Sequence, residues 1–214
     1  APWRIRLLSK KGIYTTYSLY NEQKYEVPDC RVKYIEGAYQ TYTYWEDMIP
    51  QIKNELKVKT KPSEANRLLM EEMQSCESVC VHVRRGDYLA PEFAHLNVCD
   101  QDYYMEAMQK MKAQKPDAVF YIFTNNHKEV EWIKENYDFS GFEVRYVDLD
   151  NPDYEELRLM YHCKNFIISN STYSWWGQFL SDNPHKIVMA PSVWNREMNA
   201  DGIYMPDWQV IKVK

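Results

Sequence analysis

The sequence predicts an α/β fold in which a parallel sheet carries helices on both of its faces. Two observations support this prediction. From Val79 onward, short apolar runs of strand length alternate with longer segments whose apolar residues recur at helical spacing. Strands that alternate with helices connect through right-handed crossovers, which produce parallel pairing with helices on both faces. With 214 residues, the chain is long enough for one large domain or two small ones.

Strands and helices of this alternating part are predicted in order along the chain. The first strand, Val79–Val83, is apolar and β-branched. Asp100 is placed to cap the helix that follows, whose apolar face uses Tyr104 and Met108. The later strands are predicted at Ala118–Phe123, Glu143–Val147, Phe166–Ser169 and Lys186–Ala190. The later helices are predicted at His127–Tyr137, Asp153–Cys163 and Thr172–Leu180.

The part of the chain before this alternation is less regular. Trp45–Val58 and Ser63–Ser75 are predicted to be helices, and Pro62 marks the start of the second. Residues 1–40 are rich in tyrosine and charge without a clear period, which indicates either a separate region or a partly extended one. The sequence therefore predicts a domain boundary between residues 75 and 76.

Charge and cysteine content exclude several protein classes. The net charge is -5 with acidic and basic residues interspersed, so the basic stripe of a nucleic-acid-binding protein is missing. There is no signal peptide and no apolar run long enough to span a bilayer, so membrane association is not expected. The five cysteines have no paired C-x-x-C spacing, and Cys80 and Cys163 are predicted to be buried thiols. The expected location is a reduced cytoplasm or the periphery of the inner membrane.

Polar clusters follow all five predicted strands. In an open parallel sheet the carboxyl ends of the strands meet at one edge, and ligands bind there. We therefore expect the five clusters to lie together at this edge. They are His82–Arg85, Thr124–Asn126, Asp148–Asp150, Ser169–Ser174 and Pro191–Trp194.

Two adjacent arginines, Arg84 and Arg85, follow the first predicted strand. Their guanidinium groups carry planar, forked donors that suit phosphate oxygens. Neighbouring side chains of a strand point to opposite faces, so both reach one ligand only if the backbone turns, as Gly86 permits. These residues predict an anion site, in particular one for a diphosphate. With Arg84 at the anion, Arg85 can instead pair with Asp87 or another nearby carboxylate. The alternative to an anion site is a surface cluster of arginine and aspartate side chains.

Small polar residues follow the fourth predicted strand and lead into a helix. Hydroxyl groups and free backbone N–H groups at a helix N-terminus form a cradle for an anion, which would lie opposite Arg84. Ordinary capping of the helix by Ser171 or Thr172 is compatible with this role. The residues of the predicted cradle are Ser169, Asn170, Ser171, Thr172 and Ser174.

Three stretches of the chain carry a family resemblance. His82-Val83-Arg84-Arg85-Gly86-Asp87-Tyr88 is similar to motif I of the α-1,2-fucosyltransferases, which move L-fucose from GDP-fucose to an acceptor sugar. Phe120–Asn126 resembles the second motif of that family, and Asn165–Gly177 resembles the third. The resemblance runs from near Gly37 almost to the C-terminus, in the bacterial style of the family.

The resemblance implies a GT-B-like, Rossmann-type fold and an inverting reaction. In that reaction the 2-hydroxyl of an acceptor galactose attacks the anomeric carbon of GDP-β-L-fucose to form an α-1,2 link. Arg84 would contact the diphosphate and offset the charge that builds on the leaving GDP. The family works without a metal, so none is expected, although Asp148-Leu149-Asp150 has the Asp-x-Asp pattern of metal-dependent glycosyltransferases. Asp87 beside two arginines is a poor base, and the sequence identifies no other.

The resemblance also implies that further residues bind the donor. His82 is expected near the ribose or guanine, on the side of the strand that Arg84 faces, and the alternative is a hydrogen-bonded core histidine. Thr124 and Asn125 either contact the sugar or ribose or form a simple turn. Glu156 is expected to accept N–H bonds from guanine, and the alternative is a solvated carboxylate at a helix start.

The first part of the chain departs from the family pattern. A full-length member carries a Gly-rich Leu-Gly-Asn-type motif in its first lobe, and this motif is absent here. We therefore expect residues 1–75 to be a partial acceptor-side region and residues 76–214 to be the lobe that binds the GDP-sugar. The expected partners are GDP-fucose and a galactose-containing glycan, and no nucleic acid; the sequence specifies no oligomeric state. The alternative to an active fucosyltransferase is a lobe that binds GDP or a GDP-sugar without turnover.

Overall fold

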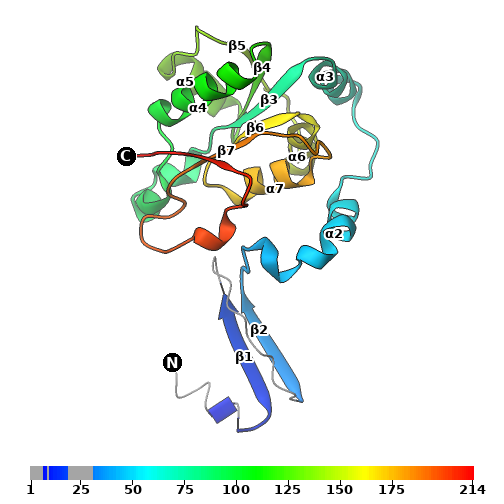
Figure 1. The fold of residues 1–214 in the computed structure, drawn as a ribbon, viewed down its shortest axis with the longest axis vertical. Coiled ribbons are helices and arrows are strands. Elements are labelled where there is room, and N and C mark those ends of the chain that lie inside the picture. The colour runs from blue at the N-terminus through cyan, green and yellow to red at the C-terminus, as the bar shows by residue number, and fades with distance from the viewer. Residues whose placement is uncertain (1–6, 9, 19–30) are drawn as a thin grey trace. The chain divides into compact units, whose positions relative to one another are not determined.

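The computed structural model describes residues 7–8, 10–18 and 31–214, and it contains two compact units (Figure 1). The smaller unit is Ala1–Ile49 with Asn199–Met205, and the larger unit is Pro50–Met198 with Pro206–Lys214. Because the larger unit contains all three stretches that carry the family resemblance, it holds the candidate site.

The smaller unit contains two strands that pair in parallel, β1 (Ile13–Ser18) and β2 (Val32–Gly37). For residues 1–40 a partly extended region was one of two alternatives, and extended structure is found at these two strands. The rest of that prediction falls on residues 1–6, 9 and 19–30, which lie outside the described residues. Short 3-10 helices are found at Tyr42–Tyr44, Glu46–Met48 and Asp201–Ile203.

A six-stranded sheet with parallel neighbours throughout forms the centre of the larger unit. Its strand order is β5-β4-β3-β6-β7-β8. The chain builds outward from β3 in one direction, then crosses back to β6 and continues in the other, as doubly wound nucleotide-binding folds do. The strands are β3 (Glu77–His82), β4 (Ala118–Phe123), β5 (Glu143–Tyr146), β6 (Asn165–Ile167), β7 (Val188–Pro191) and β8 (Gln209–Ile211).

The α/β class, the parallel sheet and the five predicted strands are confirmed. Each observed strand end lies within two residues of its predicted position. The sequence did not predict β8, a three-residue strand at the edge of the sheet that pairs with β7. Val210 in its centre is 51% exposed, so this strand lacks the continuous apolar run that marks the buried strands.

Helices cover both faces of the sheet, as predicted (Figure 1). Val79 and Val81 of β3 belong to the core beneath α4 and α5. Tyr121 of β4 points to the opposite face, where its hydroxyl lies 2.8 Å from Oε1 of Glu72 in α3. The helices are α2 (Ile49–Leu56), α3 (Glu64–Ser75), α4 (Gln101–Gln114), α5 (His127–Asn136), α6 (Asp153–His162) and α7 (Thr172–Leu180).

Two predicted helix starts are confirmed by their capping bonds. The Ser63 side chain accepts a hydrogen bond from Asn66 N at 3.2 Å and starts α3. The Asp100 side chain accepts one from Tyr103 N at 3.0 Å and starts α4. A side-chain acceptor at this position satisfies a backbone N–H that has no partner inside the helix, which is why these residue types mark helix starts.

The compact units divide the chain at Ile49, whereas the sequence suggested a boundary after residue 75. The reason is that α3 and the segment before it are bonded to α6. Asn66 Nδ2 donates to Glu155 Oε2 at 3.1 Å, and Arg158 Nη2 donates to the Thr60 carbonyl at 2.5 Å. These partners are far apart in sequence, so a local pattern does not reveal them. The functional roles assigned to the two predicted domains stay predictions.

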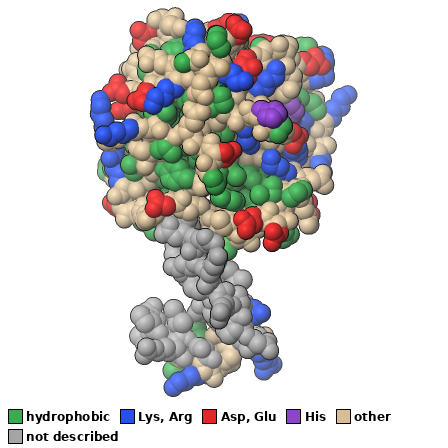
Figure 2. Space-filling view, in the orientation of Figure 1, with side chains coloured by type: hydrophobic (Ala, Val, Ile, Leu, Met, Phe, Trp, Pro, Cys, Tyr) green, Lys and Arg blue, Asp and Glu red, His purple; other side chains and the backbone are tan. Residues whose placement is uncertain are grey.

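Three predictions from composition, on membrane helices, cysteines and charge, can be checked in the described part of the structure. No helix among them is long and apolar enough to cross a bilayer. Cys80 and Cys163 are buried free thiols, as predicted. Acidic and basic side chains are interspersed on the face of the larger unit that Figure 2 shows.

Candidate functional site

The strand order places the ends of β3 and β6 side by side, because β3 pairs with β4 on one side and with β6 on the other. In open α/β sheets, ligands bind outside the carboxyl ends of the strands at the point where the winding direction changes. His82 is the last residue of β3, Val83–Arg85 follow it, and Ser169–Ser174 follow β6. Of the five polar clusters, these two therefore lie at the switch point, and Thr124–Asn126 lie beside them at the end of β4.

A tight turn at Gly86 directs the chain after β3. Gly86 has φ +54°, in the left-handed region that favours glycine. A Cβ atom here would lie 3.2 Å from Asn125 Nδ2, and Asn125 Oδ1 accepts a hydrogen bond from Arg85 N at 3.1 Å. The backbone therefore turns directly after the two arginines and is bonded to the end of β4, as the sequence requires for a shared site.

Gly86→Ala is expected to lower the free energy of unfolding by about 1–2 kcal/mol, because an L-residue is strained in the left-handed region. Urea denaturation measures the change. Gly141→Ala is the matched control, since its Cβ position has no neighbour within 4 Å. The control is expected to keep or raise stability by up to about 1 kcal/mol. Equal losses of unfolding free energy in both variants would show that the left-handed backbone at Gly86 does not require glycine.

Arg84 is partly buried at the switch point, with 28% of its side chain exposed. Its Nη2 lies 2.7 Å from Asp87 Oδ1, and its guanidinium carbon lies 5.3 Å from the centre of the Tyr88 ring. Arg84 Nε is buried and has no hydrogen-bond partner in the described part of the chain. The Tyr88 hydroxyl donates to the Asn170 carbonyl at 3.3 Å, so Tyr88 connects Arg84 to the bend after β6.

Arg85 is bonded to α5. Its Nε lies 2.8 Å from Glu129 Oε2, and its guanidinium carbon lies 3.1 Å from the centre of the Trp132 ring. Arg85 therefore pairs with a nearby carboxylate, as the sequence analysis allowed. This carboxylate is Glu129, whereas Asp87 pairs with Arg84. These contacts hold the turn that carries Arg84, and a direct contact between Arg85 and the donor stays a prediction.

His82 is 2% exposed and joins the ends of β3 and β6. Its Nδ1 lies 2.9 Å from Ser169 Oγ, and its ring centre lies 5.7 Å from that of Tyr173. Burial, with the nearby charge of Arg84, lowers the pKa of His82 to about 3, so the imidazole is neutral at pH 7. The burial matches the core-histidine alternative, and a contact with the nucleotide stays a prediction.

The predicted cradle after β6 is held in shape by its own serines. Ser171 caps α7, because its Oγ accepts a hydrogen bond from Tyr173 N at 3.3 Å. The buried Ser174 hydroxyl lies 3.1 Å from the Ser169 carbonyl and 3.0 Å from the Ser171 carbonyl. Capping by Ser171, which the sequence treats as compatible with anion binding, is thus present.

Asn170 and Thr172 have different surroundings in this bend. Asn170 Nδ2 lies 2.8 Å from both the Leu96 carbonyl and the Trp194 carbonyl, so this side chain ties three loops together. Thr172, the first residue of α7, is exposed. Asn170 therefore shapes the site through the protein itself, whereas Thr172 is accessible to a ligand.

Thr124 and Asn125 also differ, although they are neighbours at the end of β4. Thr124 Oγ1 is buried and lacks a hydrogen-bond partner among the residues described. Asn125 uses its side-chain oxygen to hold Arg85 N, which matches the turn alternative. A buried hydroxyl without a partner costs free energy, so Thr124 is the better candidate of the two for a ligand contact.

Glu156 lies in the first turn of α6 and is partly buried. Burial, with the nearby charge of Asp153, raises the pKa of Glu156 to about 7. A freely solvated carboxylate would not show this shift. The oxygens of the neighbouring Glu155 are bonded to Asn66 and Arg158. In the described part of the chain the Glu156 carboxylate has no such partner, so Glu156 is the one of this pair left for a ligand.

Sequence reasoning missed the supporting roles of Glu129, Trp132 and Tyr88. Glu129 and Trp132 lie three positions apart on α5, a spacing that places them together on one helix face. That spacing was the available signal, but the contact also requires Arg85, whose position depends on the turn after β3.

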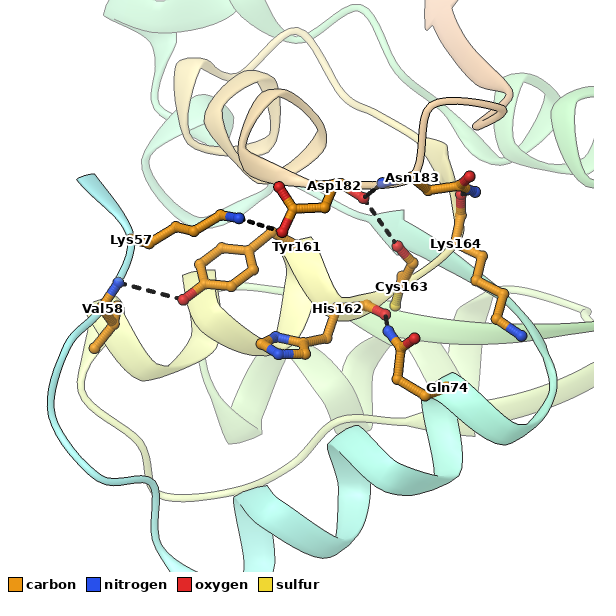
Figure 3. Close-up of a pocket in the computed structure, with 10 residues that line it drawn as sticks. Lys57, Val58, Gln74, Tyr161, His162, Cys163, Lys164, Asp182 and Asn183 are labelled. Carbon is orange, nitrogen blue, oxygen red and sulfur yellow. Dashed lines mark hydrogen bonds and ion pairs between the residues drawn. The ribbon is translucent and has the colours of Figure 1, made fainter. Parts of the chain in front are cut away.

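A cavity of about 680 Å³ lies away from these residues, where α6 and α7 end and β6 begins (Figure 3). Lys57 forms an ion pair with Asp182, and the Val58 backbone N–H donates to the Tyr161 hydroxyl at 3.3 Å. Gln74 Nε2 donates to the His162 carbonyl at the end of α6 at 2.5 Å. Much of the polar lining is therefore bonded within the protein, and the cavity lies at the edge opposite the switch point.

The family model of glycosyl transferase family 11 matches residues 10–212. The chain belongs to glycosyl transferase family 11. This match confirms the family resemblance that the three motifs indicated.

Curated relatives agree with family 11 membership. The chain is 30% identical over 141 residues to O-antigen biosynthesis glycosyltransferase WbnK of Escherichia coli, covering 63% of the chain and 45% of that protein. It is 32% identical over 140 residues to an Escherichia coli alpha-1,2-colitosyltransferase, covering 62% and 47%. It is 27% identical over 138 residues to human galactoside alpha-(1,2)-fucosyltransferase 1, covering 61% and 37%. The chain therefore matches less than half of the length of each relative.

Solved structures that resemble this family 11 chain are distant. POFUT1 in its apo form has a TM-score of 0.42 at 12% identity, covering 82% of this chain and 73% of that one. ADP-heptose heptosyltransferase II of E. coli has a TM-score of 0.42 at 12% identity, covering 71% and 44%. With TM-scores below 0.5, these likenesses carry no inference about function.

Proposed function

We propose that the switch point binds GDP-β-L-fucose and that the chain transfers fucose to the 2-hydroxyl of an acceptor galactose with inversion. The observation that carries this proposal is Arg84, a partly buried guanidinium whose Nε has no hydrogen-bond partner among the described residues. Its neighbour Tyr88 is bonded to the bend after β6. Membership of family 11 supports sugar transfer, and the names of two relatives both specify an α-1,2 link.

The proposed reaction depends on positioning and on stabilisation of the leaving group. The acceptor oxygen forms a bond to the anomeric carbon while the bond from that carbon to the diphosphate breaks. GDP leaves with the electron pair, and Arg84 with the donors of the Ser169–Ser174 bend offsets its charge. The guanidinium takes the place of a metal in this scheme. The proton of the attacking hydroxyl passes to a base outside the residues assigned here.

Transfer from GDP-fucose to lactose tests the proposal. A fucosylated product with an α-1,2 link supports it. Transfer to a different hydroxyl would contradict the proposed α-1,2 specificity. Calorimetry with GDP, ADP and UDP tests the nucleotide separately, and we expect the tightest binding for GDP. Equal affinities for the three nucleotides would overturn the assignment of guanine.

A second candidate is a lobe that binds GDP-sugar without turnover. It is favoured by the length of the match, since the aligned residues cover 45% and 47% of the two bacterial relatives. A rise in melting temperature with GDP, without any product from GDP-fucose and lactose, would support this candidate over the enzyme.

The binding of GDP-fucose is expected to tighten about tenfold between pH 6 and pH 8, because Glu156 must ionise to accept N–H bonds from guanine and has a pKa of about 7. GDP-fucose is the right ligand because it lacks the terminal phosphate of GDP, which titrates near pH 6. Calorimetry at both pH values measures the change. In Glu156→Gln the binding should be weaker at pH 8 and nearly independent of pH. If Glu156→Gln shows the same pH dependence of GDP-fucose binding as wild type, Glu156 is not the residue that binds guanine.

A further inference from the structure

Three side chains of metal-ligating type gather at the surface beside the end of β5. His127 starts α5, Glu131 lies one turn later on the same helix, and Asp148 follows β5. His127 Nδ1 lies 2.7 Å from Asp148 Oδ2, and one ligand atom from each of the three residues lies within 4.8 Å of the others. We propose that His127, Glu131 and Asp148 form a binding site for a divalent transition-metal ion such as zinc.

The backbone positions these side chains without help from an ion. Residues four apart on a helix lie on one face, so His127 and Glu131 point to the same side of α5. Val147 N donates to the Ile122 carbonyl at 3.0 Å, which fixes the chain next to Asp148 against β4. Zinc binds nitrogen and oxygen ligands at about 2.0–2.2 Å, so ligand atoms on one ion lie about 3–4 Å apart. The observed separations, from 2.7 Å up to 4.8 Å, bracket that spacing.

The donor set indicates which class of ion fits. One imidazole nitrogen with two carboxylate oxygens suits zinc and similar ions, whereas magnesium and calcium prefer oxygen ligands alone. The imidazole also separates this group from a chance pair of surface carboxylates. One cation competes for the site, because Lys134 Nζ lies 2.7 Å from Glu131 Oε1.

The metal site is distinct from the residues proposed to bind the donor. Its ligands come from α5 and from the loop after β5, at the outer strand of the sheet, whereas Arg84 and the Ser169–Ser174 bend lie at the switch point. A bound ion would link the first turn of α5 to that loop. The inference therefore holds or fails independently of the proposed fucosyl transfer.

Calorimetric titration of the protein with zinc chloride, in a preparation without a histidine tag, tests the site. We expect binding to one site per chain in the micromolar range, with no comparable heat from magnesium chloride. His127→Ala and Asp148→Asn should each weaken zinc binding at least about tenfold. Cobalt chloride should produce visible absorption bands that both variants lose.

Two matched variants sharpen this test. His185→Ala removes an exposed histidine elsewhere and should leave zinc binding unchanged. Lys134→Met removes the competing cation and should tighten it. Circular dichroism checks that each variant is folded, as expected for exposed positions. Absent zinc binding, magnesium binding as tight as zinc, or equal zinc affinity in His127→Ala and wild type would each overturn the proposal.

Discussion

Arg84→Ala is expected to lower the rate of fucosyl transfer by about a hundred- to a thousandfold, while the fold survives. The leaving GDP gains negative charge as its bond to fucose breaks, and Arg84 is the guanidinium at the switch point that is not already held by α5. Its Nε is buried without a partner in the described residues, so a donor is in place before the ligand arrives. Initial rates with GDP-fucose and lactose measure the loss.

Matched changes separate the role of Arg84 from a general loss of charge. Arg145→Ala removes a half-exposed arginine on β5, which pairs with Glu143, and should retain the wild-type rate. Arg84→Lys keeps the charge without the planar fork and should lie between wild type and alanine. If the wild-type chain binds GDP without turnover, the same order should appear in GDP affinity. A near-normal rate or affinity in Arg84→Ala would remove the basis of the proposed site.

Most of the sheet could be predicted from the sequence because β3, β4, β6 and β7 are buried strands, whereas β5 alternates between exposed and partly buried side chains. Ala118–Phe123 was predicted to the residue, since all six of its side chains are buried and helices flank it on both sides. The strand order could not be predicted, because pairing of β3 with β6 depends on contacts between distant parts of the chain. β8 was missed for a related reason, since a three-residue edge strand is defined by its partner rather than by its own pattern.

The candidate site was only partly predictable. The residue types at the strand ends showed where the switch-point residues would gather, because parallel strands share an edge. The sequence could not predict which of the two adjacent arginines is held by α5. That depends on the positions of Glu129 and Trp132, which bind Arg85. Likewise, Thr124 and Asn125 look equivalent in sequence, and only their hydrogen bonds distinguish them.

The largest effect on stability is expected for Arg158→Ala, which should lower the free energy of unfolding by about 3–5 kcal/mol. Arg158 is 4% exposed, and its Nη2 lies 3.3 Å from Glu155 Oε1 on the same helix. The same nitrogen donates to the Thr60 carbonyl and lies 3.0 Å from the Thr60 hydroxyl. Removing the guanidinium would leave a buried carboxylate without its countercharge, which costs far more than the pair itself gains.

The chain provides a close control for this comparison. Arg67 and Glu64 are the same pair of residue types, also three positions apart, but their side chains are 42% and 72% exposed. Arg67→Ala should therefore cost less than about 1 kcal/mol. Urea denaturation of both variants measures the difference, and adding Glu155→Gln to Arg158→Ala should recover part of the loss. Similar costs for Arg158→Ala and Arg67→Ala would show that water reaches the inner pair. In that case the buried charges of Glu155 and Arg158 would not be what stabilises α6, the helix that carries Glu156.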